Sequence, residues 1–421
     1  MEKLDKIDIY LNRTNLEEKI YGISYVFDRV LRLDYSIKFH EFDSYKIYKD
    51  GSEVLDIVNE VLSKDSGYER IGVNWERARD NLPFFGSYNY TNGCFDLDIF
   101  GSIFYFLSHQ HLRILLRDSH DRECLSDEMI FALRRPFLNY YIEQFIIVLG
   151  SAINVPLKTE YKGHFNITID VDHMSSIPNF SKYFKESAKD LLLHKDPLTC
   201  LQRLFSYLSL TRDPHDIVKW SKSLSKKYRA ELIYFLHKPI GLSKYDRSWV
   251  GNSHILQSLL TSNVELGTHP SYYSSNSEIT LYSELKAIKE MILAQGTKSF
   301  KNRHHFLRYR RETSWKVLES LGFSSDFSIG FSGLIGFPSG ICWSYSYWRQ
   351  DVRRATTIDQ FDVTIMDRTV LASKVCSATV KDVISESKKF RGDITFVGHN
   401  CLLSRRKEKR KLLKYLSHYY G

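Results

Sequence analysis

The chain has 421 residues, 43% of them apolar and 26% charged, a balance typical of a water-soluble globular protein with room for two domains. The formal net charge is +9, but glycine-rich phosphate loops and the common nucleic-acid-binding motifs are missing, so no nucleic-acid partner is expected. The six cysteines are scattered, which argues against a disulfide framework or a thiolate zinc site and fits a reducing compartment.

The N-terminal sequence lacks an apolar signal segment, and no run of about 18 apolar residues occurs in the chain. We therefore expect no transmembrane helix and a cytoplasmic protein. The C-terminal tail, residues 404–421, is rich in lysine and arginine. It could contact an anionic membrane, although a solvated terminal helix is the simpler interpretation. The oligomeric state is left open.

The first part of the chain, residues 1–158, mixes strand and helix patterns. Three segments predict strands: "KIDIYLN", "YSIKFHEF" and "KIYKDG". Two longer segments predict helices: "DLDIFGSIFYFLSHQHLRILL" and "RRPFLNYYIEQFIIVLGSAI", the second opened by Pro136. We predict a smaller α+β N-terminal domain here.

From residue 165 onward, strand-like and helix-like segments alternate. The predicted strands are "FNITIDVD", "AELIYFLH", "VELGTHPS", "HHFLRYR" and "DITFVGHN". The predicted helical segments are 180–228, "SWVGNSHILQSLLTSN", "NSEITLYSELKAIKEMILAQG" and "ETSWKVLESLG". Such alternation is typical of a parallel sheet with crossover helices. The fold class is therefore α/β, and about seven units suit a closed or distorted (β/α) barrel over residues 159–403.

Polar residues suited to catalysis follow several of these strands. Asp170 and Asp172 close the first strand and point to the same side, since a strand repeats every two residues. The others are His269, the Arg303–His305 segment and His399, and the carboxyl ends of parallel strands meet at one edge. Each alone has a structural explanation, such as a turn, a cap or a hydrogen-bonded core histidine. Together, one carboxylate and two imidazoles suit a divalent metal, and a second carboxylate and a further histidine supply a base and an acid.

Six segments in order resemble the polysaccharide deacetylase family, also described by its NodB homology. They are "TIDVDH", "ELGTHPSYYS", "NRHHFLRYRRETSWKVLESLGFSSDFSIGF", "IGFPSGIC", "MDRTVL" and "FVGHN". The most similar branch carries an extra N-terminal domain and occurs with surface-polysaccharide genes, and "FGSIFYFLSH" and "RDSHDRE" resemble that domain. The resemblance implies a distorted (β/α) barrel and metal-dependent removal of N- or O-acetyl groups from sugars.

The resemblance also implies roles for individual residues. Asp170 matches the catalytic base, and Arg303 the arginine that pairs with it. His399 matches the general acid, and Asp326 the carboxylate that tunes it. Asp172 and His269 match two metal ligands.

Two positions depart from the family pattern. Tyr273 stands where many deacetylases have a second metal histidine, so we assign His305 as the third ligand, with His304 as the alternative. Pro338 stands where the branch commonly has an arginine, which would alter substrate contacts. The favoured ion is Zn²⁺.

Four further residues are candidates for contacting an acetylated carbohydrate: Tyr272, Tyr273, His173 and Trp343. Packing of loops at the barrel mouth explains the aromatic residues equally well. The predicted protein is a metal-dependent carbohydrate deacetylase in surface-polysaccharide biosynthesis. Two alternatives are a hydrolase for another amide or ester, and a degenerate relative that binds glycan or a partner without turnover.

Overall fold

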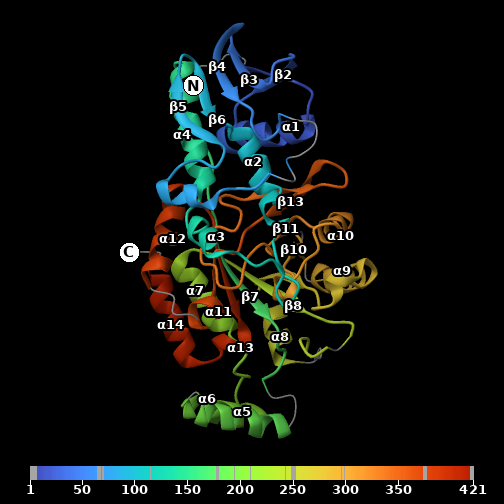
Figure 1. Cartoon of the computed structure of the whole chain (residues 1–421). Helices are drawn as coiled ribbons and strands as arrows, with labels where there is room; N and C mark the ends of the chain where they lie inside the picture. Colours follow the sequence, from blue (N-terminus) through green and yellow to red (C-terminus); the bar gives the residue numbers. More distant parts are fainter. Residues whose placement is uncertain are drawn as a thin grey trace. The chain divides into compact units, whose positions relative to one another are not determined.

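A computed structural model describes residues 7–417 except 64–67, 69–70, 114, 177–179, 194, 209, 242, 248–252, 295, 298 and 373–376 (Figure 1). The chain packs into two compact units, which we describe separately. Unit 1 comprises Met1–Gly163, Gly336–Asp359 and Glu386–Gly392. Unit 2 comprises His164–Ile335, Gln360–Ser385 and Asp393–Gly421. Unit 1 thus collects two segments from far along the chain. The domain boundaries inferred from the sequence stay a prediction.

Unit 1 contains a mixed sheet of six strands in the order β2-β1-β3-β4-β6-β5. The strands are β1 (Ile7–Leu11), β2 (Tyr35–Phe39), β3 (Ser44–Lys49), β4 (Ser52–Val58), β5 (Gly86–Thr91) and β6 (Cys94–Leu97). Strand β1 runs parallel to β2 and antiparallel to β3, and its burial alternates along the strand. One face of this strand therefore packs into a core, as a period of two requires.

The helices of unit 1 are α1 (Leu16–Ser24), α2 (Ile99–Leu107), α3 (Asp127–Ala132) and α4 (Phe137–Ala152). A π-helical turn (Tyr25–Leu31) and 3₁₀ turns (Trp75–Asp80, Gln110–Leu112) also occur. Helix α4 confirms the second helix predicted from the sequence, and α2 confirms the first part of the other, which ends at Leu107 and not near residue 116. Every residue of α2 is buried, and Asp98 caps it by accepting from the Gly101 N–H. Strands β12 (Tyr345–Arg349) and β13 (Arg354–Gln360) form a hairpin. Apart from its last residue, this hairpin lies in the Gly336–Asp359 segment of unit 1.

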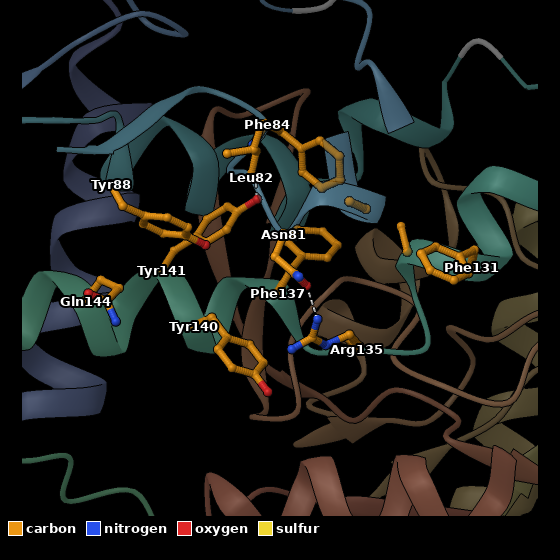
Figure 2. A pocket seen from close by; sticks show the side chains of 12 residues that line it. Asn81, Leu82, Phe84, Tyr88, Phe131, Arg135, Phe137, Tyr140, Tyr141 and Gln144 are labelled. Carbon is orange, nitrogen blue, oxygen red and sulfur yellow. Dashed lines mark hydrogen bonds between the residues drawn. The ribbon is translucent and has the colours of Figure 1, made fainter. Parts of the chain in front are cut away.

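Unit 1 also holds a cavity of about 370 Å³ with a mainly aromatic lining (Figure 2). Arg135 donates to the Asn81 side chain there and lies over the Tyr140 ring, 4.9 Å from its centroid. The Tyr141 hydroxyl accepts the backbone N–H of Phe84, 3.0 Å away. Among the described lining residues, Arg135 carries the one charged side chain.

Unit 2 is built on a parallel sheet in which the strand order is β11-β10-β9-β8-β7-β15-β14. The strands are β7 (Phe165–Val171), β8 (Glu231–His237), β9 (Glu265–His269), β10 (Lys301–Asn302), β11 (Ser325–Asp326), β14 (Ile365–Met366) and β15 (Ile394–His399). All seven residues of β7 are buried, as expected for a central parallel strand covered on both faces. The predicted α/β class is confirmed.

The helices of unit 2 are α5 (Phe180–Leu192), α6 (Pro197–Tyr207), α7 (Val218–Tyr228), α8 (His254–Thr261), α9 (Glu278–Leu293), α10 (Ser314–Ser320), α11 (Asp367–Ala372), α12 (Ser377–Lys389), α13 (Asn400–Leu403) and α14 (Arg406–Leu416). Part of α12 belongs to unit 1. The start of the helix predicted around α8 lies outside the described residues. Ser277 caps α9 by accepting the Thr280 N–H. None of the described helices has the length and hydropathy needed to span a membrane.

The predicted strand "HHFLRYR" is wrong. Strand β10 ends at Asn302, and a 3₁₀ turn (His305–Leu307) follows. Phe306 and Leu307 both adopt left-handed backbone conformations, with φ of 61° and 55°. Two such residues in succession are unfavourable unless the surroundings hold them, and they end the extended chain beside His305.

Candidate metal centre

Histidines and aspartates gather where the strands of unit 2 end. Asp170 pairs in register with His399 on β15, and His237 pairs in register with His269 on β9. Asp172 follows β7 directly. All five residues are buried. Parallel pairing of adjacent strands therefore places their side chains along one edge of the sheet.

Asp172, His269 and His305 form the centre of this group. The Asp172 Oδ1 atom lies 3.5 Å from His269 Nε2 and 3.7 Å from His305 Nε2. One ligand atom from each residue lies within 4.8 Å of the other two. Ligands bound to zinc at about 2.0–2.2 Å lie about 3.3–3.6 Å apart in a tetrahedron. The three side chains therefore have the spacing that one ion requires.

The hydrogen bonds around His269 favour a cation at this position. Its Nδ1 lies 2.7 Å from the Arg303 carbonyl oxygen, which can only accept, so Nδ1 carries the proton. Nε2 then presents a lone pair toward the Asp172 carboxylate. Neither His269 Nε2 nor Asp172 Oδ1 has a hydrogen-bond partner, although both atoms are buried. Because two buried acceptors repel each other, a bound cation explains the arrangement.

His305 is oriented by a residue that the sequence did not reveal. Its Nδ1 lies 3.1 Å from Asp246 Oδ1, and the Asp246 carboxylate also accepts from the Tyr272 N–H and the Ser243 hydroxyl. A carboxylate at Nδ1 holds the proton there and leaves Nε2 free to bind a metal. Asp246 lies in a loop after β8, and no local pattern marks it.

His237 also faces Asp246, with Nε2 3.3 Å from Oδ1. His237, Asp246 and His305 form a second group with metal-ligand spacing, which shares His305 with the first. His237 Nδ1 lies 3.0 Å from the His269 carbonyl oxygen. His237 therefore links β8 to β9 next to the first group.

Asp170 is paired with a buried arginine. Arg303 Nη1 donates to Asp170 Oδ1 at 2.9 Å, and the same nitrogen donates to the Thr168 hydroxyl. Burial disfavours the charged form of Asp170, but the Arg303 guanidinium together with His269 and His399 holds the pKa of Asp170 below its ordinary value. An ionised carboxylate is thus maintained beside the His269 and His399 rings, whose Nε2 atoms lie 3.9 and 4.0 Å away.

The carboxylate that contacts His399 is Asp367, and the sequence-based assignment of Asp326 to this contact is wrong. Asp367 Oδ1 lies 2.7 Å from His399 Nδ1, and Oδ2 accepts the His399 backbone N–H. Burial alone would lower the pKa of His399, but the charge and hydrogen bond of Asp367, together with the Asp172 charge, raise it. Asp367 follows the short strand β14, so a search for polar residues directly after strands could have identified it.

Asp326 is a buried structural residue at the end of β11. Its carboxylate accepts from the Asn302 amide and from the backbone N–H and hydroxyl of Ser328. Burial raises the pKa of Asp326 to about 6 despite these bonds. None of these contacts reaches His399.

His304 and His305 occupy different positions relative to the group of possible ligands. His305 joins the group of possible ligands, whereas the ring nitrogens of His304 are buried without hydrogen-bond partners. Burial, with a smaller contribution from His269, lowers the pKa of His304 to about 3. His304 is therefore a neutral core residue.

The four candidate substrate residues have different surroundings. Tyr273 is 48% exposed, while Tyr272 is buried and packs on Tyr245, with ring centroids 4.1 Å apart. His173 is half-buried, and its carbonyl accepts from the Asn400 side chain. Trp343 is buried in unit 1, where its indole N–H donates to the Phe390 carbonyl, so we assign it to that core. Pro338 also belongs to unit 1.

Comparisons with known proteins describe the chain only in part. Residues 7–154 match a family model described as "Family of unknown function (DUF7033)". No curated protein matches the sequence. The chain is 13% identical to a solved structure described as "putative polysaccharide deacetylase from Mycobacterium smegmatis". That match covers 61% of this chain and 84% of the other, with a TM-score of 0.36. Such a distant likeness carries no assignment, so the proposal below depends on the site itself.

Proposed function

We propose that the chain is a metal-dependent hydrolase that removes acetyl groups from a sugar or polysaccharide in surface-polysaccharide biosynthesis, in the cytoplasm. The observation that carries the proposal is the convergence of three pairs at one sheet edge: Asp172 with His269, Asp170 with Arg303, and His399 with Asp367. They supply a cation site, a base and an acid within a single group. The sequence resemblance described above supports the same chemistry.

Asp172, His269 and His305 would hold the divalent ion, for which two imidazoles and one carboxylate suit zinc. When bound, such an ion polarises the acetyl carbonyl and lowers the pKa of a bound water towards ~7. Asp172 Oδ1 and His269 Nε2, which are buried without hydrogen-bond partners, fit this assignment.

The other residues move protons. Asp170, kept ionised by Arg303, accepts a proton from the water that attacks the acetyl carbon. His399, protonated at Nε2 and held at Nδ1 by Asp367, donates a proton to the leaving nitrogen or oxygen. The C–N or C–O bond breaks, and acetate and a free amine or hydroxyl are released.

Two further features support the proposal. Tyr273 presents an exposed ring next to Tyr272, which suits stacking on a sugar. The Phe361 N–H donates to the Asp326 carbonyl, the Val363 N–H to the Ile329 carbonyl and the Thr364 N–H to the Thr395 carbonyl. These bonds connect the segment after residue 360 to both β11 and β15, as closure of a distorted barrel requires.

The test combines metal content with acetate release. We expect the full chain to bind one divalent ion and to release acetate from acetylated sugar oligomers. Asp172→Asn should lose the ion, and activity should fall at least about 10³-fold, because several kcal/mol of transition-state stabilisation disappear. Asp170→Asn should keep the ion and lose about 10²–10⁴-fold in kcat.

The outcomes separate the alternatives. Glycan binding without acetate release would favour a degenerate binding protein, in line with the Tyr273 and Pro338 departures. Hydrolysis of other esters or amides in preference to acetylated sugars would identify a different hydrolase. A wild-type chain without bound metal would contradict the proposal.

A further inference from the structure

Helices α5 and α6 form a hairpin in unit 2 that Figure 1 shows standing away from the sheet of that unit. Many of its apolar side chains are in contact with solvent. Six of them are 43–77% exposed: Leu191, Leu192, Leu193, Leu198, Leu201 and Phe205. Leucines left in water forgo the free energy that their burial would release. Exposed apolar side chains concentrated on one hairpin mark a surface that binds a partner or a lipid.

The seam between the two helices is polar. Arg203 Nε donates to Asp190 Oδ2 at 2.5 Å, and the two side chains are almost completely buried. Thr199 is buried as well, and its N–H and hydroxyl donate to Asp196. The hairpin therefore buries the Arg203–Asp190 ion pair and exposes leucines, the reverse of an ordinary water-facing helix pair.

An apolar solvent would stabilise this arrangement. In a bilayer, helices satisfy their own backbone, polar side chains pair between helices, and apolar side chains face the lipid. The helices have 13 and 11 residues, which at 1.5 Å per residue is too short to cross the hydrocarbon core of about 30 Å. Such a hairpin suits shallow insertion into one leaflet.

The charges on the hairpin indicate which membrane it would meet. Among its described side chains, the exposed charged ones are Lys185 and Lys195, both cations. Glu186 pairs with Lys189, and Asp196 caps α6. Lysines beside an apolar patch can bury their stems while the ammonium groups reach lipid phosphates.

We propose that the α5–α6 hairpin docks unit 2 onto an anionic lipid bilayer surface. The occupant is the lipid surface and not a second copy of the chain, because the exposed charges match anionic headgroups and would repel their own copies. This docking site is separate from the metal centre and does not depend on the proposed hydrolysis.

Flotation of the full chain with lipid vesicles tests the inference. We expect the protein to float with vesicles of phosphatidylcholine and phosphatidylglycerol, less with phosphatidylcholine alone, and less as salt screens the lysines. The double variant Leu192→Glu/Leu198→Glu should bind at least about tenfold more weakly, since two buried leucines are lost.

The matched control is Ile279→Glu, which places the same charge at an 81% exposed apolar position on α9. It should float like the wild type, and circular dichroism and metal content should be unchanged in both variants. Absence of wild-type flotation would overturn the inference. So would a dimer in analytical ultracentrifugation that Leu192→Glu/Leu198→Glu abolishes without any vesicle binding, which would assign the surface to a second copy.

Discussion

Two buried aspartates, one in each compact unit, show how differently the protein treats the same side chain. Asp98 in unit 1 accepts the backbone N–H groups of Glu60, Val61 and Gly101 at 2.8–2.9 Å. Asp172 in unit 2 has an equally hidden Oδ1 atom with no donor. Both carboxylates are costly to bury. Backbone N–H groups compensate Asp98, whereas Asp172 faces the rings of His269 and His305 and the Arg368 guanidinium, which lies 3.6 Å from its Oδ2 atom.

The comparison suggests a rule for this molecule. A carboxylate satisfied by amides holds the fold together, as Asp98 joins the end of β4 to α2. The buried aspartates that face imidazole nitrogens, Asp172, Asp246 and Asp367, lie in the proposed site. In the cavity of unit 1, the Tyr141 hydroxyl accepts the Phe84 N–H and the Tyr140 hydroxyl donates to Glu386, so these two polar groups bond within the unit (Figure 2).

The largest effect should distinguish Asp367 from Asp326. Asp367→Asn should lower kcat about 10²-fold, because His399 loses the carboxylate that holds its proton. Since Asp367 raises the pKa of His399, activity should decline as pH rises through that pKa. In the variant this alkaline limb should move to lower pH. The measurement is a pH–rate profile of acetate release.

Asp326→Asn is the matched control for that experiment. It changes an equally buried carboxylate that does not contact His399, so the alkaline limb should keep its position. If the alkaline limb shifted equally in both variants, the distinction between structural and site carboxylates would be contradicted.

A smaller effect is expected at Asp246. Asp246→Asn should weaken zinc binding about 10–100-fold, because the carboxylate that fixes the proton on His305 Nδ1 is lost. Competition with a chelator measures the change, and Asp213→Asn, a buried loop carboxylate bonded to backbone N–H groups, is its control. If Asp246→Asn removed the ion while Asp172→Asn retained it, the metal would belong to the His237–Asp246–His305 group instead.

The smallest effect concerns stability. Asp98→Asn should lower the free energy of unfolding by about 1–2 kcal/mol, since an amide can accept from fewer of the three N–H groups. Added zinc should raise Tm in the wild type and in Asp98→Asn by the same amount, but not in Asp172→Asn. Thermal unfolding with and without zinc measures this. A zinc response in Asp172→Asn would show that this carboxylate is not a ligand.

The sequence predicted the features that follow a regular pattern, namely the alternating strands and helices. Apolar strands ending in polar residues located Asp170, Asp172, His269 and His399 at one edge, since parallel strands share their direction. It did not reveal Asp246, whose loop has no periodic pattern. The predicted strand at 304–310 was wrong because the left-handed Phe306 and Leu307 are held by tertiary contacts rather than by local propensity.

The composition of unit 1 limits how the protein can be dissected. Residues 336–359 are bonded to the N-terminal segment of this unit. Tyr21 donates to the Ser346 carbonyl, Tyr161 bonds to Ser344 and Arg353 pairs with Glu18. A fragment starting after Gly163 would therefore carry Trp343 and its aromatic neighbours without the surfaces that cover them. Unit 2 cannot be isolated by a single truncation, and any trimmed version needs internal excision with new joins in place of the two inserted segments.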